Sequence, residues 1–249
     1  MTVKFFPESL RWVAMCDVLG FREMLRHSPI GLIAERYDGL VQAARTATRS
    51  HGFDIENIYA DSFTVVPAPV GQVVFSDSIL LCSRPVAIHD PNRDDTQTFS
   101  TVAAAAGLVL AVREMIQVSI MHEMPLRVGV AFGPCVVDQE RGIHVGPAII
   151  DAFDAEQAQE WIGGACHSSC LSAPGFDALR APGPLVRYAV PAKTRQLDWA
   201  INWPETANAS VEPILRAGAG RVAEERYRRK WTNAVEFFDA TNVTARLKR

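Results

Sequence analysis

The segment that most constrains the fold is the apolar run at residues 11–18, RWVAMCDV. A short run of apolar residues without alternation is typical of a strand that is buried on both faces of a sheet. The run ends in an acidic residue, Asp17, and a glycine follows at Gly20. We therefore expect a central strand that places one carboxylate at its carboxyl end.

Segments that favour helices and strands alternate along the rest of the chain. A hairpin is expected at residues 72–83 around Ser76-Asp77-Ser78, and another joins 125–137 to 142–145. Residues 55–66 are rich in β-formers and indicate an extra strand or an extended connection. A last strand is expected at residues 185–190. Helices are expected at residues 21–26, 29–49, 100–122 with Ser100 as the cap, 147–161 and, after a loop at 218–220, 221–238. This order predicts a ferredoxin-like α+β sheet with helices on one face.

Composition and charge limit the classes of protein to consider. The 249 residues are 48% hydrophobic and 21% charged, which is typical of a folded globular chain. The formal net charge of −3 disfavours a nucleic-acid-binding protein. The first residues do not have the pattern of a signal peptide, and the longest apolar run falls short of a membrane span. With five cysteines, an odd number, we expect a cytoplasmic protein with reduced thiols, without a membrane anchor.

Charge is distributed unevenly along the chain. Residues 216–249 contain nine basic and four acidic residues, so the acidic excess lies in the rest of the sequence. We expect a single domain overall. Its core is residues 1–165, and residues 166–249 complete the sheet and end in a basic helical tail.

Two acids mark the ends of neighbouring strands. In a ferredoxin-like sheet the first strand lies beside the first hairpin, so Asp17 and Asp77 could face each other and hold two Mg²⁺ or Mn²⁺ ions about 4 Å apart. This predicts phosphoryl or nucleotidyl transfer: one ion lowers the pKa of an attacking hydroxyl, and the other neutralises a triphosphate. The turn Val18-Leu19-Gly20-Phe21 offers N–H groups to phosphate oxygens. An Asp at a strand end is also an ordinary turn former, and Asp61 is a rival for the second position.

Residues near these acids are candidates for binding a base or a ribose. Tyr59 has a flat face and a polar tip, although a place in the core or on the sheet surface is the alternative. Phe75 and Ser76 flank Asp77 and are candidates for the same pocket.

Four motifs in this order resemble those of the class III nucleotidyl cyclases. They are Asp17-Val18-Leu19-Gly20-Phe21, Ser76-Asp77-Ser78, Arg127-Val128-Gly129 through Gly133, and Val145-Gly146. The resemblance covers residues 11–161. It implies the ferredoxin-like cyclase domain, with a C-terminal extension, and a site for two divalent cations at Asp17, Val18 and Asp77.

Departures from the family pattern bear on the base and on the phosphates. Purine-specific members carry a Lys four residues before the second metal Asp and an Asp three residues before the Gly that opens the helix. This chain has Val73 and Ile143 there, which cannot bond a base edge. The helical Asn/Arg pair that contacts ribose and the transition-state phosphate is also missing. Its places hold Ile150 and Asp154 or, one residue on, Asp151 and Ala155.

Other cations are expected to have structural roles. We expect Arg127 to be mainly structural and Arg113, in the middle of a helix, to face solvent. The basic segment at residues 226–230 either forms a solvated helix face or neutralises a polyphosphate bound to a partner subunit.

The chain is similar to the uridylate or cytidylate cyclases of Pycsar antiphage systems, through Ser76-Asp77-Ser78, Gly146-Pro147-Ala148 and the acidic helix at 151–156. That resemblance implies a homodimer with active sites at the interface. It implies conversion of UTP to 3′,5′-cyclic UMP and pyrophosphate after phage infection, with the diffusible product switching on a separate effector protein. Production of cyclic CMP from CTP, a degenerate nucleotide-binding sensor and a purine cyclase with altered base contacts are the alternatives.

Overall fold

The computed structural model describes residues 8–59, 62–86, 95–180, 182–222 and 224–246. Its centre is an eight-stranded sheet with the order β4-β5-β1-β6-β8-β10-β9, and β7 pairs with β6 beside this path. A separate two-stranded sheet is formed by β2 (Phe53–Tyr59) and β3 (Ser62–Pro67). The strands of the main sheet are β1 (Ser9–Val18), β4 (Gly71–Phe75), β5 (Ser78–Cys82), β6 (Leu126–Asp138), β7 (Ile143–Val145), β8 (Gly163–Cys166), β9 (Leu185–Arg187) and β10 (Trp199–Ile201).

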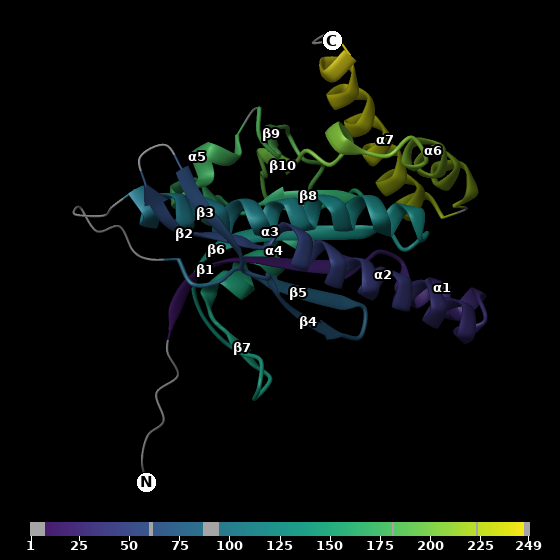
Figure 1. Ribbon diagram of the computed structural model, residues 1–249. Coiled ribbons are helices and arrows are strands. Elements are labelled where there is room, and N and C mark those ends of the chain that lie inside the picture. Colours follow the sequence, from purple (N-terminus) through teal and green to yellow (C-terminus); the bar gives the residue numbers. More distant parts are fainter. Residues whose placement is uncertain (1–7, 60–61, 87–94, 181, 223, 247–249) are drawn as a thin grey trace.

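Helices lie along the sheet and at its ends. Figure 1 shows α2 and α3 running along the sheet, with α1 at one end of the molecule and the β2–β3 hairpin at the other. The helices are α1 (Phe21–His27), α2 (Ile30–His51), α3 (Asp95–Met121), α4 (Pro147–Ala158), α5 (Phe176–Leu179), α6 (Val211–Arg221) and α7 (Glu225–Arg246).

The strand order confirms the α+β class and the ferredoxin-like arrangement. β1 pairs antiparallel with β5 on one side and with β6 on the other, and β4 pairs antiparallel with β5. These four strands therefore have the order of a βαββαβ unit, with β1 in the middle. β8 then pairs parallel with β6, and β10 and β9 extend the sheet beyond it.

The helices cover both faces of the sheet, so the prediction that they lie on one face is wrong. Side chains alternate along β1: Trp12 and Ala14 belong to the cluster of α2 and α3, whereas Val13 and Met15 belong to a second cluster with α4. α4 can lie directly on β6 because Gly129 has no side chain: a Cβ there would be 2.0 Å from the carbonyl oxygen of Ala152.

The core on the α2–α3 face is almost entirely apolar. It includes the fully buried Trp12, Leu40, Leu108 and Ile116. By length and composition alone, the segment Phe99–Met121 of α3 is the one helical stretch of the described residues that could span a membrane. Of its most apolar window, 61% is buried inside the molecule, which is also typical of a core helix.

Several predicted boundaries are wrong. Residues 55–66, expected to form an extra strand or an extended connection, contribute to two strands, β2 and β3. α4 ends at Ala158 rather than 161, and β9 ends at Arg187 rather than 190. α3 begins at Asp95, so Ser100 lies inside it and is not its cap. Gly218 and Gly220 lie in α6 and not in a loop. Gly218 gives room to Trp231 of α7, whose ring atoms would be 2.4 Å from a Cβ at this position.

Candidate active site

Asp17 lies at the carboxyl end of the central strand. In register it is paired with Ser78 of β5 on one side and with Arg127 of β6 on the other. The alternation along β1 places Asp17 on the same face as Val13 and Met15, which is the face covered by α4. The acidic residue predicted at the end of the first strand therefore faces α4 and away from the α2–α3 core.

Asp77 is brought beside Asp17 by a tight turn. Ser76 and Asp77 are the two residues between Phe75 and Ser78, which pair as the ends of β4 and β5. Ser76 adopts a left-handed backbone conformation with φ 54°, which is uncommon for a residue with a side chain. The carbonyl oxygen of Asp77 then accepts a hydrogen bond of 3.1 Å from the N–H of Val18.

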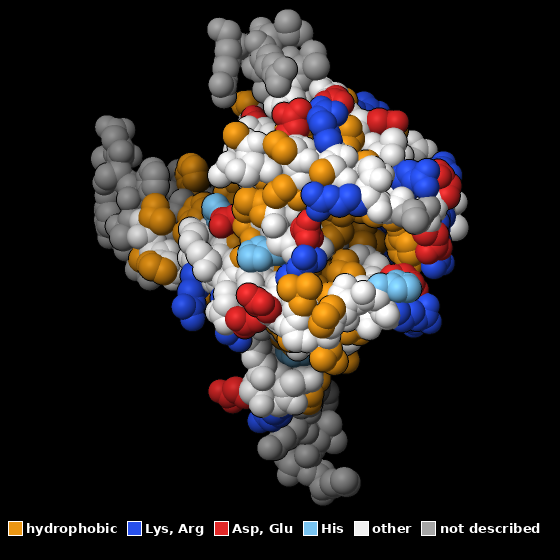
Figure 2. Space-filling model, turned by 90° about the vertical axis from the view of Figure 1, so that its right-hand side faces the viewer, with side chains coloured by type: hydrophobic (Ala, Val, Ile, Leu, Met, Phe, Trp, Pro, Cys, Tyr) orange, Lys and Arg blue, Asp and Glu red, His pale blue; other side chains and the backbone are white. Residues whose placement is uncertain are grey.

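The two aspartates line one cavity of about 270 Å³. The turn after β1 forms part of its wall, and charged residues of α1 and α7 complete it. Figure 2 faces the end of the molecule that carries α1 and shows acidic and basic side chains close together there. The lining residues are Asp17, Val18, Gly20, Phe21, Arg22, Glu23, Arg26, Asp77, Arg226 and Tyr227.

The turn Val18–Phe21 has fewer N–H groups to offer than the sequence suggests. The N–H of Val18 donates to Asp77, and that of Leu19 donates to the carbonyl oxygen of Pro125 at 2.9 Å. In this structure the N–H groups of Val18 and Leu19 are therefore bonded within the protein, and the contact of the turn with phosphate stays a prediction. Gly20 has φ 76°, a conformation that favours glycine.

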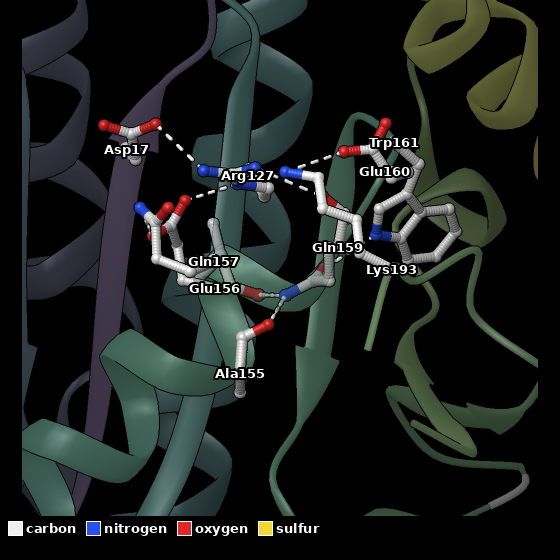
Figure 3. A network of polar contacts seen from close by, with 10 residues as sticks. Asp17, Arg127, Ala155, Glu156, Gln157, Gln159, Glu160, Trp161 and Lys193 are labelled. Carbon is white, nitrogen blue, oxygen red and sulfur yellow. Dashed lines mark hydrogen bonds and ion pairs between the residues drawn. The ribbon is translucent and has the colours of Figure 1, made fainter. Parts of the chain in front are cut away.

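Arg127 connects Asp17 to α4 (Figure 3). Its guanidinium lies 3.5 Å from the carboxylate of Asp17, is ion-paired with Glu156, and donates a 3.1 Å hydrogen bond to the carbonyl oxygen of Gln159. Arg127 is 5% exposed and Glu156 is 1% exposed. Arg127 therefore has the structural role expected for it, and it is also the cation paired with Asp17.

Burial alters the titration of both acids beside Arg127. It raises the pKa of Asp17, an effect that the charge of Arg127 opposes and that of Asp77 reinforces. Burial also raises the pKa of Glu156 to about 7, against the stabilising charge of Arg127. Without Arg127, both carboxylates would therefore be harder to ionise in this environment.

α4 does not bring an Asn/Arg pair to the cavity in either register. Ile150 is 63% exposed, and Ala155 is buried. Asp154 lies 3.8 Å from Arg195, and Asp151 lies 3.3 Å from His167. These contacts tie α4 to the C-terminal part of the chain.

Phe75 and Ser76, which were expected to bind the base or the ribose, are not among the residues that line this cavity. Ser76 and Phe75 are exposed at the β4–β5 turn. Tyr59 lies in β2, but its side chain is outside the described residues, and Figure 1 shows the β2–β3 hairpin at the end of the molecule away from α1. Asp61, the rival to Asp77, also lies outside the described residues.

Three charged residues of the cavity were not predicted from the sequence. Arg22, Glu23 and Arg26 come from α1, and the pattern that could have indicated them is their position directly after the turn. Arg226 comes from the basic tail, and it reaches the cavity within the same chain.

Arg113 was expected to face solvent, but it is largely buried and lies 3.7 Å from Glu205.

The donor set at the cavity fits a hard divalent cation. Among the described residues, no three His, Cys, Asp or Glu side chains come together as a metal site. Mg²⁺, however, commonly takes only one or two protein carboxylates and completes its shell with water and substrate phosphates. Asp17 and Asp77 are such a pair.

Comparison with protein-family models finds no match, and neither does comparison with curated protein sequences. Among solved structures, the chain is similar to the adenylyl cyclase CyaB from P. aeruginosa, with 13% identity, 80% of this chain and 96% of that chain covered, and a TM-score of 0.48. It is also similar to a dimeric guanylyl cyclase domain of the RhoGC fusion protein from Blastocladiella emersonii, with 14% identity, coverages of 80% and 97%, and a TM-score of 0.49. The guanylate cyclase domain of RhGC from Catenaria anguillulae in complex with GTP is 13% identical, with 78% of this chain and 97% of that chain covered and a TM-score of 0.46. These values are too low to support a function, which must rest on the chain's own residues.

Proposed function

We propose that the protein is a nucleotidyl cyclase. The observation that carries the proposal is that Asp17 and Asp77, predicted from separate motifs, line one cavity beside the turn that follows β1. Two carboxylates at a cavity with several arginines suit a reaction on a polyphosphate. The strand order and the four motifs resembling class III cyclases support the same reaction.

In the proposed reaction, the 3′-hydroxyl oxygen of a nucleoside triphosphate bonds to the α-phosphorus, and the bond from that phosphorus to pyrophosphate breaks. The hydroxyl proton leaves to solvent. Asp17, Asp77 and the backbone of Val18 would hold two Mg²⁺ or Mn²⁺ ions, which supply charge neutralisation and a more acidic hydroxyl. The ion pair with Arg127 holds Asp17 in place, and the charge of Arg127 opposes the rise that burial causes in the pKa of Asp17.

The proposed substrate is UTP, and the proposed product is 3′,5′-cyclic UMP, with CTP and cyclic CMP as the close alternative. Val73 and Ile143 stand where purine-specific cyclases have a Lys and an Asp, so the contacts that select adenine or guanine are missing. Ser76, in the turn beside Asp77, is the residue we propose for contact with the pyrimidine or ribose, whereas the place of the β2–β3 hairpin away from α1 speaks against the same role for Tyr59 (Figure 1).

We further propose that the active protein is a homodimer with its sites at the interface. α4 leaves Ile150 63% exposed and Phe153 48% exposed, and the neighbouring Val145 is 56% exposed. Such exposed apolar side chains, on α4 and at the end of β7 just before it, suit burial against a second copy. In this proposal, residues 1–165 are the cyclase core, and residues 166–249 complete it.

The resemblance to Pycsar cyclases supports a role in antiphage defence. The diffusible product would activate a separate effector protein, and the cyclase would act in the cytoplasm. Membranes and nucleic acids have no part in this proposal.

The test is incubation of the full chain with each of the four nucleoside triphosphates and Mn²⁺, followed by mass spectrometry of the products. The expected result is cyclic UMP with pyrophosphate, and less of any other cyclic nucleotide. Cyclic AMP or cyclic GMP as the dominant product would contradict the pyrimidine proposal.

A second candidate function is a nucleotide sensor that does not turn over its ligand. It is favoured by the missing Asn/Arg pair on α4 and by the ion pair between Asp17 and Arg127. Calorimetry with UTP distinguishes the two: a sensor binds UTP and releases no pyrophosphate, whereas the cyclase releases one pyrophosphate for each UTP consumed.

A further inference from the structure

The C-terminal helix brings positive charge to the candidate active site of its own chain. Arg226 and Tyr227 of α7 line the same cavity as Asp17 and Asp77. Lys230 follows Arg226 by four residues, so both lie on one side of the helix. Lys230 is close enough to Asp17 for its charge to lower the pKa of that carboxyl.

Contacts further along the helix hold α7 in this position. The side chain of Asn233 donates a 2.6 Å hydrogen bond to the carbonyl oxygen of Glu160. Trp231 packs against Gly218 of α6, and Phe237 is fully buried with its ring 4.8 Å from that of Trp161. The placement of the first turns of α7 over the cavity therefore follows from the core and does not depend on a ligand.

Tyr227 arranges the two cations. The guanidinium of Arg226 lies 4.7 Å from the centre of the Tyr227 ring, and the ammonium of Lys230 lies 5.6 Å from it. These are distances of cation–π interactions. The ring itself lies against the turn after β1, 3.8 Å from where Gly20 would carry a Cβ. Tyr227 thus joins the cations of α7 to the wall of the cavity.

The backbone and α4 groups expected to hold a triphosphate at this cavity are engaged or missing, so side-chain cations must balance its charge. Two of the cations that line the cavity, Arg26 and Arg226, also pair with Glu23 and Glu224. The N–H groups of Val18 and Leu19 are hydrogen-bonded within the protein, and α4 has Ile150 and Asp154 in place of Asn and Arg. Lys230 is half-buried, and it takes part in none of the ion pairs found among the described residues, although the charges of Glu160 and Asp17 act on it from further away. Burying a cation without an ion-pair partner is unfavourable unless an anion joins it.

We propose that Arg226 and Lys230 bind the triphosphate of the substrate within the same subunit, and that Tyr227 positions them. The proposal rests on the proposed function for the identity of the ligand, and it assigns to the basic tail the contacts that α4 lacks. It differs from the sequence-based alternative of a contact to a partner subunit, because here the same chain provides both aspartates and both cations.

The experiment measures binding of inorganic tripolyphosphate to the full chain by calorimetry in the presence of Mg²⁺. Arg226→Gln and Lys230→Gln should each weaken binding by roughly tenfold, as expected for the loss of a hydrogen bond to a charged group. Arg229→Gln is the matched control, since Arg229 is exposed on the same helix and lines neither this cavity nor the neighbouring one, which Lys230 lines together with Gly20 and Tyr227. The affinity of this control variant for tripolyphosphate should stay within about twofold of that of the wild type.

Further measurements distinguish a role of the Lys230 charge in binding from a role in stability. They also distinguish failure of the triphosphate-binding proposal from failure of the cyclase proposal. Lys230→Arg keeps the charge and should restore most of the affinity, whereas a merely structural role for Lys230 predicts a lower unfolding temperature in Lys230→Gln. Binding that depends on both cations in a chain that cyclises no nucleotide would leave this proposal standing and refute the proposed function. Turnover of UTP with KM and tripolyphosphate affinity unchanged in both variants would refute this proposal alone.

Discussion

The two faces of the central sheet differ in what covers them. On the α2–α3 face, a large apolar cluster contains the fully buried Trp12 and Leu108. On the α4 face, the apolar cluster is small, and the surface continues from Met15 to Asp17, Arg127 and Glu156. The first face is built like the core of any globular protein, whereas the second buries charges against each other.

The difference indicates that stability and chemistry are divided between the faces. Burial raises the pKa of both Asp17 and Glu156, so keeping these acids ionised is unfavourable for the fold. Arg127 compensates for part of this effect. An arrangement that lowers stability locally is typical of functional sites.

The largest loss of stability is expected on the apolar face. Leu108→Ala removes a fully buried side chain of α3 and should lower the free energy of unfolding by about 4 kcal/mol. Leu25→Ala makes the same change on α1, where the side chain is 44% exposed, and should lower it by no more than about 1 kcal/mol. Urea denaturation measures both; equal losses would contradict the assignment of the core to the α2–α3 face.

The charged face should make stability depend on pH through Glu156. Its pKa of about 7 lies above the ordinary value of 4.5, so the folded protein keeps this proton where the unfolded chain has lost it. The free energy of unfolding should therefore fall, by roughly 3 kcal/mol from this group, as pH rises from 4.5 to 7. The free energy of unfolding of Glu156→Gln, measured by urea denaturation at several pH values, should not show this fall between pH 4.5 and 7. Parallel profiles for variant and wild type would show that Glu156 titrates normally.

A third prediction concerns the close approach of α4 to β6. Gly129→Ala places a Cβ 2.0 Å from the carbonyl oxygen of Ala152, so α4 must move, at a cost of about 2 kcal/mol. Gly31→Ala on α2 is the control: a Cβ there meets no atom within 4 Å, and an alanine in a helix should raise stability by about 0.5–1 kcal/mol. Thermal unfolding of the two variants should therefore shift in opposite directions, and a stabilised Gly129→Ala would contradict the packing.

The smallest effect on the fold is expected at the exposed part of α4. Ile150→Glu should change the free energy of unfolding of a monomer by no more than about 0.5 kcal/mol, because this side chain is 63% exposed. It should weaken the proposed homodimer by at least roughly tenfold, since a charge would enter an apolar interface. Sedimentation equilibrium measures this, with Ile30→Glu, 77% exposed on α2, as the control. A dimer unaffected by Ile150→Glu would place the interface elsewhere.

Local patterns in the sequence predicted the strands and turns that hold the two aspartates. The apolar run ending in Asp17 and the hairpin around Asp77 are each set by neighbouring residues, so their structure is visible in the sequence. The strand order followed from the order of these elements.

Features that depend on residues far apart in the sequence could not be predicted from local sequence patterns. The close approach of α4 to β6 depends on the missing side chain at Gly129, and that of Trp231 to α6 depends on the missing side chain at Gly218. Arg113 pairs with Glu205, 92 residues further along the chain. The return of α7 to Gly20 through Tyr227 likewise comes from the tertiary fold.

We propose that the α4 face carries a nucleotide-cyclising site built on Asp17 and Asp77. The most direct test is pyrophosphate release from UTP by Asp77→Asn, with its free energy of unfolding measured alongside. Losing a metal-binding charge should lower the rate by about a thousandfold or more while the fold is kept, because this carboxylate lies at an exposed turn. A folded Asp77→Asn that releases pyrophosphate at the wild-type rate would contradict the account.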